Sequence, residues 1–143
     1  MIEPVISLSK KTVVAMVHLP ALPGSPDYDP EEGTNKILDA VTLDLEALQS
    51  GGVDAIMFGN EFDRPYVLKA PPEGLASLAA VIGQVKSMIK VPFGVNYLWD
   101  PVATVALAVS TEADFAREIY TGLYASDMGL WAPNCAVLSL IHI

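Results

Sequence analysis

The chain has 143 residues, 52% of them hydrophobic, which excludes a disordered chain and indicates one domain with a buried core. Eight basic residues against 17 acidic ones give a net charge of −9, which argues against nucleic acid or an anionic membrane surface as a partner. No apolar run reaches the roughly 18 residues of a membrane-spanning helix, the N-terminus lacks the charge order of a secretory signal, and the single cysteine, Cys135, favours a reducing compartment. The composition predicts a soluble, cytoplasmic protein without membrane insertion.

The first predicted unit is a strand followed by a helix. Residues 12–18, TVVAMVH, are apolar and β-branched, as in a strand buried on both faces. A loop rich in proline and glycine covers 19–33, and residues 34–50 predict a helix. Thr34 is its expected cap, and Gly51–Gly52 end it. One apolar stripe identifies the side that packs on the sheet: Ile37, Leu38, Val41, Leu45 and Leu48.

Two more units follow with the same alternation. Residues 53–59, VDAIMFG, predict a second buried strand, and 75–89 a second helix. Residues 91–97, VPFGVNY, predict a third strand. The third helix spans 100–111, with Asp100 as its cap and proline in its first turn.

A fourth strand, less apolar than the others, is expected over 114–122. Strands that alternate with helices predict an α/β protein with a parallel sheet. No dinucleotide fingerprint or Walker loop follows any strand, so a barrel is favoured over an open nucleotide-binding sheet. About four parallel βα units make the N-terminal half of a TIM-like (β/α)8 barrel.

The end of the chain has a different texture. After Gly129 the sequence reads LWAPNCAVLSLIHI, and its last six residues look like the translation of a transposase adapter used for sequencing libraries. We therefore expect residues 1–143 to be a single, partial barrel domain from a truncated reading frame, with a non-native tail at 131–143. On this interpretation Cys135 and His142 carry no chemistry. The alternative is a native C-terminal strand.

Polar residues follow the predicted carboxyl ends of the strands, where α/β folds place their sites. His18 is the candidate acid or base, Glu61 is its candidate partner, and Asn96 would orient a substrate by hydrogen bonding. These three form the predicted catalytic set. The predicted substrate-binding residues are Asn60, Asp63, Arg64, Tyr120, Thr121 and Asp127.

Each candidate also has a structural explanation. His18 could hydrogen-bond a loop carbonyl and fix the proline-rich turn, and Glu61 with Arg64 could form a surface ion pair. No short ligand spacing such as HxH is present, so no metal site is predicted, and no cofactor is identified. The remaining alternatives are a backbone or cap bond for Asn96, simple packing for Tyr120 and a turn for Asp127.

Four motifs in order resemble the BtpA/SgcQ family. They are MVHLPALPGSPDY, GGVDAIMFGNEFDRPY, VPFGVNYLWDPVATVALA and DFAREIYTGLYASDMGL. The resemblance as a whole extends from about residue 12 to residue 130. The resemblance implies a TIM-like barrel of the ribulose-phosphate-binding type. One cyanobacterial member is linked to photosystem I biogenesis, and others accompany genes of sugar uptake or metabolism.

The resemblance carries over residue by residue. The family motifs match at His18, Asn60, Glu61, Asp63, Asn96, Tyr120, Thr121 and Asp127. NEFDRPY has the form of the sugar-associated members. The segment FAREIYTG departs from the family's FIRVNVYTG-like strand, because it is one residue shorter and lacks the asparagine.

Two functions follow as expectations. The first is a cytoplasmic enzyme that acts on a small sugar-phosphate- or nucleoside-like metabolite by acid/base chemistry at the strand ends. The alternative is a non-catalytic assembly or stability factor for a membrane complex such as photosystem I. Barrel phosphate sites commonly follow strands seven and eight, and half a barrel leaves apolar strand edges unpaired. We therefore expect the 143-residue chain to be inactive and to form homo-oligomers or aggregates.

Overall fold

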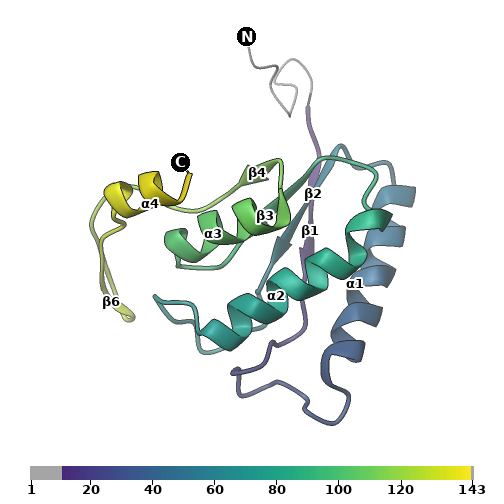
Figure 1. Cartoon of the computed structure of the whole chain (residues 1–143), viewed down its shortest axis with the longest axis horizontal. Coiled ribbons are helices and arrows are strands. Elements are labelled where there is room, and N and C mark those ends of the chain that lie inside the picture. Colours follow the sequence, from purple (N-terminus) through teal and green to yellow (C-terminus); the bar gives the residue numbers. More distant parts are fainter. Residues whose placement is uncertain (1–10, 143) are drawn as a thin grey trace.

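A computed structural model describes residues 11–142, with side chains placed at all of these except 135 and 140–142. Two groups of elements succeed one another along the chain (Figure 1). The first comprises β1 (Val14–His18), α1 (Gly33–Ser50), β2 (Ala55–Gly59), α2 (Pro72–Val85), the short 3₁₀ helix η1 (Lys86–Met88), β3 (Phe93–Asn96), α3 (Pro101–Thr111) and β4 (Phe115–Ala116). The second comprises β5 (Tyr124–Ser126), β6 (Gly129–Trp131) and α4 (Cys135–His142).

The first four strands form one parallel sheet in the order β1-β2-β3-β4. Each step moves the chain to the next strand in the same direction, so right-handed crossovers place all the connecting helices on one face. Figure 1 shows α1, α2 and α3 on that face. The predicted α/β class and the four parallel strands are confirmed, and the arrangement is that of half a TIM-like barrel.

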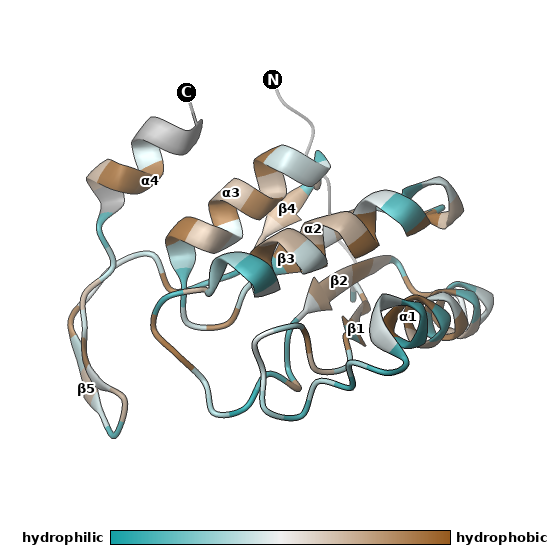
Figure 2. Cartoon of the chain, turned by 60° about the horizontal axis from the view of Figure 1, so that its bottom comes forward, coloured by the Kyte–Doolittle hydropathy of each residue, from teal (hydrophilic) through white to brown (hydrophobic). Residues whose placement is uncertain are grey.

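The core lies between this sheet and its helices. Val17, Phe58 and Val95 are neighbours in register and have no exposed surface. They pack against the predicted stripe of α1, of which Ile37, Val41 and Leu45 are buried. Burying one such side chain stabilises the fold by about 1.5–3 kcal/mol. In Figure 2 the hydrophobic colour runs along β2 and the inner stretches of α2 and α3, as expected for this layer.

The opposite face of the sheet has no helix among the described residues, and we call it the helix-free face. The register places Met16, Met57, Gly94 and Phe115 abreast on it. The ring of Phe115 covers Gly94 so closely that an added Cβ would lie 2.2 Å from the ring. Glycine at this position is therefore a requirement of packing.

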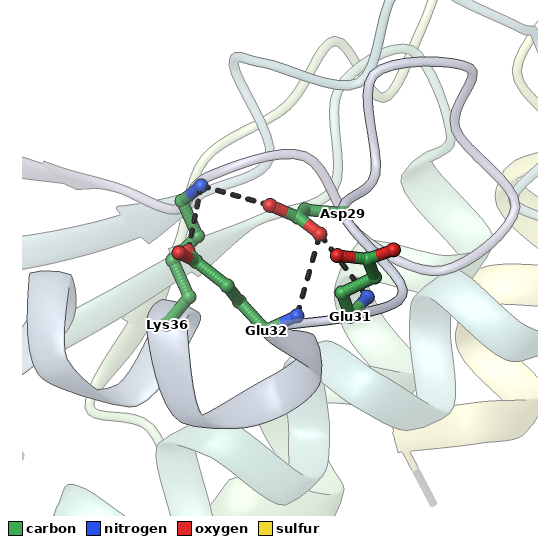
Figure 3. Close-up of polar contacts among 4 residues, drawn as sticks. All are labelled: Asp29, Glu31, Glu32 and Lys36. Atoms are coloured by element: carbon green, nitrogen blue, oxygen red, sulfur yellow. Dashed lines mark hydrogen bonds and ion pairs between the residues drawn. The ribbon is translucent and has the colours of Figure 1, made fainter.

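The start of α1 differs from the prediction. Its N-terminal residue is Gly33, whose N–H donates to the carbonyl of Asp29 at 2.9 Å. The Asp29 carboxylate accepts the N–H groups of Glu31 and Glu32 and also binds Lys36 at 3.2 Å (Figure 3). Thr34 was predicted as the cap, but it lies inside the first turn, so that prediction is wrong. The predicted cap of α3 is confirmed, because Asp100 accepts the N–H groups of Val102 and Ala103.

The fourth strand is much shorter than predicted. β4 ends at Ala116, and only the N–H of Arg117 still bonds to the carbonyl of Val95, at 3.2 Å. The Glu118 carboxylate then accepts the N–H groups of Ile119 and Trp99 and turns the chain out of the sheet. The chain continues into the antiparallel hairpin β5–β6, which extends away from the parallel sheet.

The last described segment is a helix. Asn134 Oδ1 accepts the N–H groups of Ala136 and Val137 and so caps α4, and Leu138 is buried where α4 packs on α3. The alternative of a C-terminal strand is therefore wrong, while the non-native origin of 131–143 stays a prediction. Among residues 11–142, every helix is too short or too polar to cross a lipid bilayer.

Candidate functional site at the carboxyl ends of the strands

Three strands end side by side on the helix-free face. His18, Gly59 and Asn96 are the last residues of β1, β2 and β3, and each is paired with the next in register. Neighbouring strands lie about 4.8 Å apart, so His18 and Asn96 stand about 10 Å apart on the same side of the sheet. Gly59 has no side chain between them.

His18 does not fix the proline-rich loop. Its half-buried ring meets Phe62 edge to face, with 6.4 Å between the ring centres. The imidazole forms no hydrogen bond to any other residue in the described part of the chain. Both ring nitrogens therefore remain available to a ligand.

Asp63 fixes that loop instead. Its Oδ1 accepts the N–H of Leu22 at 2.7 Å, and its Oδ2 accepts from the amide of Asn60 at 3.2 Å. Asn60, buried at 3% exposure, also accepts the N–H of Leu98 at 2.8 Å. The loops after β1, β2 and β3 are thus joined by a clamp of two side chains, Asn60 and Asp63. Both were predicted to bind substrate, and both are engaged in holding the loops.

Burial shapes the electrostatics of this clamp. Desolvation raises the pKa of the Asp63 carboxyl, although the hydrogen bonds from Leu22, Asn60 and Tyr97 oppose the rise. Burial also raises the pKa of the Tyr97 phenol, and the carboxylates of Asp63, Asp100 and Glu73 add to the effect. Tyr97 is therefore a neutral hydroxyl in the folded protein at any ordinary pH.

Asp100 adds a second link between loops. Besides capping α3, its Oδ2 accepts the N–H of Ala70 at 2.8 Å. The end of the β2–α2 loop is thereby tied to the start of α3. The predicted cap therefore also positions the loop that carries Asn60 and Asp63.

The clamped loops enclose a cavity of about 230 Å³. Prolines and tyrosines make up half of the lining residues, and Asn60 and Asp63 contribute polar atoms. Two of its prolines come from the loop after β1, namely Pro23 and Pro26. The proline-rich loop is therefore a stiff wall of this cavity.

Asn96 belongs to a second polar group, together with Glu118. The Asn96 amide donates to the carbonyl of Arg117 at 2.6 Å and to Glu118 Oε2 at 2.8 Å. Glu118 was not among the predicted site residues, because the strand expected over 114–122 put Tyr120 and Thr121 at its carboxyl end and Glu118 in its middle. An end at Arg117, directly beside the end of β3, would have placed Glu118 next to Asn96.

Glu61 and Arg64 lie at the rim. Glu61 Oε1 accepts from the Tyr66 hydroxyl at 3.0 Å and lies 3.8 Å from Arg64 Nη2. The two side chains are 36% and 60% exposed, so the pair contributes little to stability. These contacts match the surface ion pair that the sequence left open, and the structure does not join Glu61 to His18.

The remaining predicted residues lie beyond β4. Tyr120 is half-buried, and burial with the nearby Glu118 carboxylate raises the pKa of its phenol. Thr121 is exposed, with its carbonyl bound to the Tyr124 hydroxyl, and Asp127 lies exposed in the turn of the β5–β6 hairpin. The structure places Tyr120 near Glu118 but leaves Thr121 and Asp127 outside the strand ends.

The described residues contain no group of three or more His, Cys, Asp or Glu side chains arranged to hold a metal ion. The groups at the strand ends are an imidazole, an amide, a carboxylate and phenols. Such groups can transfer protons and form hydrogen bonds with a small ligand.

Known proteins resemble this chain over nearly its whole length. It is 56% identical over 126 residues to the putative sgc region protein SgcQ of Escherichia coli (strain K12), covering 88% of this chain and 47% of that protein. It is 35% identical over 133 residues to an uncharacterized protein of Pyrococcus horikoshii, covering 92% and 50%. The photosystem I biogenesis protein BtpA of Synechocystis is 29% identical over 125 residues, covering 85% and 43%.

The chain spans about half the length of the curated relatives it matches. No solved structure is significantly similar to it. The model of the BtpA family matches residues 9–141, which include all four motifs. The chain therefore belongs to the BtpA family.

Proposed function

We propose that this chain supplies part of the active site of a (β/α)-barrel enzyme that acts on a small sugar-phosphate- or nucleoside-like metabolite by acid/base chemistry. One observation carries the proposal. His18 and Asn96 end β1 and β3, the two strands on either side of β2, and both lie on the helix-free face with the bare backbone of Gly59 between them. Polar groups that converge from several strand ends are what a barrel active site is built from.

The roles follow from the contacts. The imidazole of His18 has no hydrogen-bond partner among the described residues, so it is free to accept or donate a proton. Asn96 is held by Arg117 and Glu118, so its amide can orient a substrate group. The clamp of Asn60 and Asp63 positions the loops around them.

The second candidate is a non-catalytic assembly factor. Its support is the Synechocystis relative, whose name assigns it to photosystem I biogenesis. That relative is 29% identical, whereas SgcQ is 56% identical. The imidazole of His18, unpaired among the described residues, suits acid/base chemistry, and this supports the enzyme over the assembly factor.

The proposal includes the partners and the compartment. The partner is a small molecule, the enzyme works in the cytoplasm, and the chain associates with further copies of itself. The helix-free face supports the association, because it carries apolar side chains such as Val14 at 38% exposure. The positions of a phosphate group and of further catalytic residues are left to the rest of the barrel.

The test titrates the isotopically labelled chain with a panel of phosphorylated sugars and nucleosides and follows the His18 imidazole by NMR. Binding is expected to shift this signal in the wild-type chain. His142→Ala, which changes the other histidine of the sequence, is the matched control and is expected to leave the shift unchanged. Turnover is measured with the longer Escherichia coli relative, since this chain supplies only part of the site, and alanine at the position aligned with His18 is expected to abolish it. Failure of the chain to bind any compound, together with unchanged turnover of the substituted relative, would contradict the proposal.

A further inference from the structure

A cavity of about 400 Å³ lies at the carboxyl ends of β3 and β4. We call it the β4-edge cavity. It is separate from the cavity that the clamped loops enclose, and His18 does not line it. Its lining residues are Asn96, Leu98, Trp99, Arg117, Glu118 and Ile119.

Asn96 presents an unused acceptor in this cavity wall. The residue is 1% exposed. Its side-chain NH₂ group donates two hydrogen bonds, one to the carbonyl of Arg117 and one to the carboxylate of Glu118. These two acceptors fix the orientation of the amide, so Oδ1 is the atom left over. Oδ1 is buried and has no hydrogen-bond partner in the described structure. Buried acceptors of this kind are rarely left unpaired, and each calls for an explanation.

Trp99 presents an unused donor in the same wall. Its indole Nε1–H is buried and has no partner among the described residues. Its backbone has φ of 69°, a left-handed conformation that costs energy in a non-glycine residue. Two contacts hold Trp99 in this conformation. Its backbone N–H donates to Glu118 at 3.1 Å, and its ring meets that of Trp131 edge to face with 5.7 Å between the ring centres. Trp99 thus keeps a strained backbone in the position where its indole lines the same cavity as Asn96.

The unused groups define the ligand chemistry. An acceptor on Asn96 and a donor on Trp99 lie in a wall that also carries a carboxylate and an apolar ring. A hydroxyl group both donates and accepts, so adjacent hydroxyls satisfy the two orphaned atoms at once. The Glu118 carboxylate is bonded to both residues and disfavours an anionic ligand. Arg117 is the one cationic side chain that the described lining contains, so the two charges balance and favour a neutral ligand.

We propose that the β4-edge cavity binds a neutral, hydroxyl-rich compound such as a sugar or a cyclic polyol. Both orphaned atoms are closed to solvent in this structure, so binding turns the two side chains toward the ligand. The ligand hydroxyls then donate to Asn96 Oδ1 and accept from Trp99 Nε1–H, and an apolar face of the ligand packs on the indole. The proposal rests on the proposed function in one respect, since it takes the strand ends as the ligand site. In the complete barrel, this half would then bind the uncharged part of the substrate.

The experiment is calorimetry of the whole chain with D-ribose, D-glucose and myo-inositol as probes, and ribose 5-phosphate as the charged match to ribose. We expect saturable binding of at least one neutral probe and at least tenfold weaker binding of the phosphate. Trp99→Phe keeps the ring but removes the donor, and it is expected to weaken binding at least tenfold. Trp131→Phe is the matched control: it keeps an aromatic ring against Trp99 and removes an indole N–H from a residue that does not line the cavity, so it is expected to bind like the wild type.

A wild-type measurement covers the case in which Trp99→Phe fails to fold. The chain has two tryptophans, so its ¹⁵N spectrum shows two indole signals, which Trp131→Phe assigns. The neutral probe is expected to shift the Trp99 indole signal and to slow its hydrogen exchange, while the Trp131 signal changes little. Absence of binding by all three probes, tighter binding of ribose 5-phosphate, or an unmoved Trp99 signal would each overturn the proposal.

Two variants separate this proposal from the proposed function. Glu118→Gln keeps a hydrogen-bond acceptor and removes the charge, so the affinity for ribose 5-phosphate is expected to rise more than that for ribose. His18→Ala is expected to leave the calorimetric binding of the neutral probe to this chain intact, whereas alanine at the aligned position of the longer Escherichia coli relative is expected to abolish turnover. Loss of neutral-probe binding in His18→Ala would show that the ligand occupies a different place and would overturn the assignment of this cavity.

Discussion

The carboxylate of Asp63 accepts the backbone N–H of Leu22 at 2.7 Å, across 41 positions of sequence. This bond ties the proline-rich loop after β1 to the loop after β2. Asn60 extends the link to the loop after β3 through Leu98. The loops at the carboxyl ends of the strands are therefore held together by a few partly buried hydrogen bonds, and His18 forms none of them.

Asp63→Ala should lower the free energy of unfolding by about 1–3 kcal/mol, because it leaves the N–H of Leu22 without an acceptor in a partly buried place. Asp63→Asn should cost less, since its amide oxygen can still accept that N–H. Urea denaturation measures both. Asp44→Ala, at an exposed position of α1, should stay within about 0.5 kcal/mol of the wild type. Equal losses for Asp63→Ala and Asp44→Ala would show that the clamp contributes nothing.

Tyr97→Phe should change the response of the protein to alkaline pH. Burial, helped by the carboxylates of Asp63, Asp100 and Glu73, raises the pKa of the Tyr97 phenol above its ordinary value of 10.0. The unfolded chain therefore loses this proton first, so the stabilisation is fully present below pH 10 and is lost as the pH rises above it. The wild type should lose up to about 1.4 kcal/mol per pH unit there relative to Tyr97→Phe. Urea denaturation of both proteins from about pH 8 to pH 11 measures the difference, and parallel curves would contradict the prediction.

The sequence predicted the elements whose pattern is strong and local. The apolar runs ending at His18, Gly59 and Asn96 are strands, and the stripe of α1 faces the core. The cap at Asp100 was also predictable, because proline follows it directly. Strands and helices of this kind are set by periodicity and capping, both of which are visible in a single sequence.

The misses have a different physical origin. FAREIYTG reads as a strand, but Glu118 bonds to Trp99 and Asn96, which lie 19 and 22 positions away, and β4 ends before it. Asp63 was expected to meet a ligand and instead meets a backbone N–H of another loop. Partners so far apart in sequence leave no periodic signal, so such contacts become visible only when the strand ends are brought together.

Gly94→Ala should destabilise the sheet by about 1–3 kcal/mol, the usual cost of overpacking. An added Cβ would lie 2.2 Å from the Phe115 ring, so the ring must leave the helix-free face. The matched control is Gly83→Ala in α2, where nothing lies within 4 Å. That change should stabilise the protein by about 0.5–1 kcal/mol, since alanine is the better helix former. Urea denaturation measures each change. In the Phe115→Ala background, Gly94→Ala should lower the free energy of unfolding by less than it does in the wild type, and an equal loss in both would mean that the ring is not the cause.

Val14→Lys should reduce self-association of the chain. β1 and β4 are the two edges of the parallel sheet, and the apolar helix-free face adjoins them, so copies of the chain are expected to pair through these surfaces. Val14 lies on β1 on the same side as Met16 and His18 and is 38% exposed. A lysine there adds a charge that must be desolvated on pairing. Sedimentation velocity should show associated species for the wild type and a shift toward the monomer for Val14→Lys.

The control for this shift is Leu43→Lys. Leu43 is an apolar residue of α1, 66% exposed, and lies outside the stripe that packs on the sheet, so its change adds the same charge on the helix-covered side of the sheet and not on the helix-free face. Association of Leu43→Lys should match that of the wild type. If both variants became monomeric, net charge alone would explain the effect. A wild-type chain that sediments as a monomer and melts cooperatively would show that the helix-free face is stable in water, and the proposed association would then be wrong.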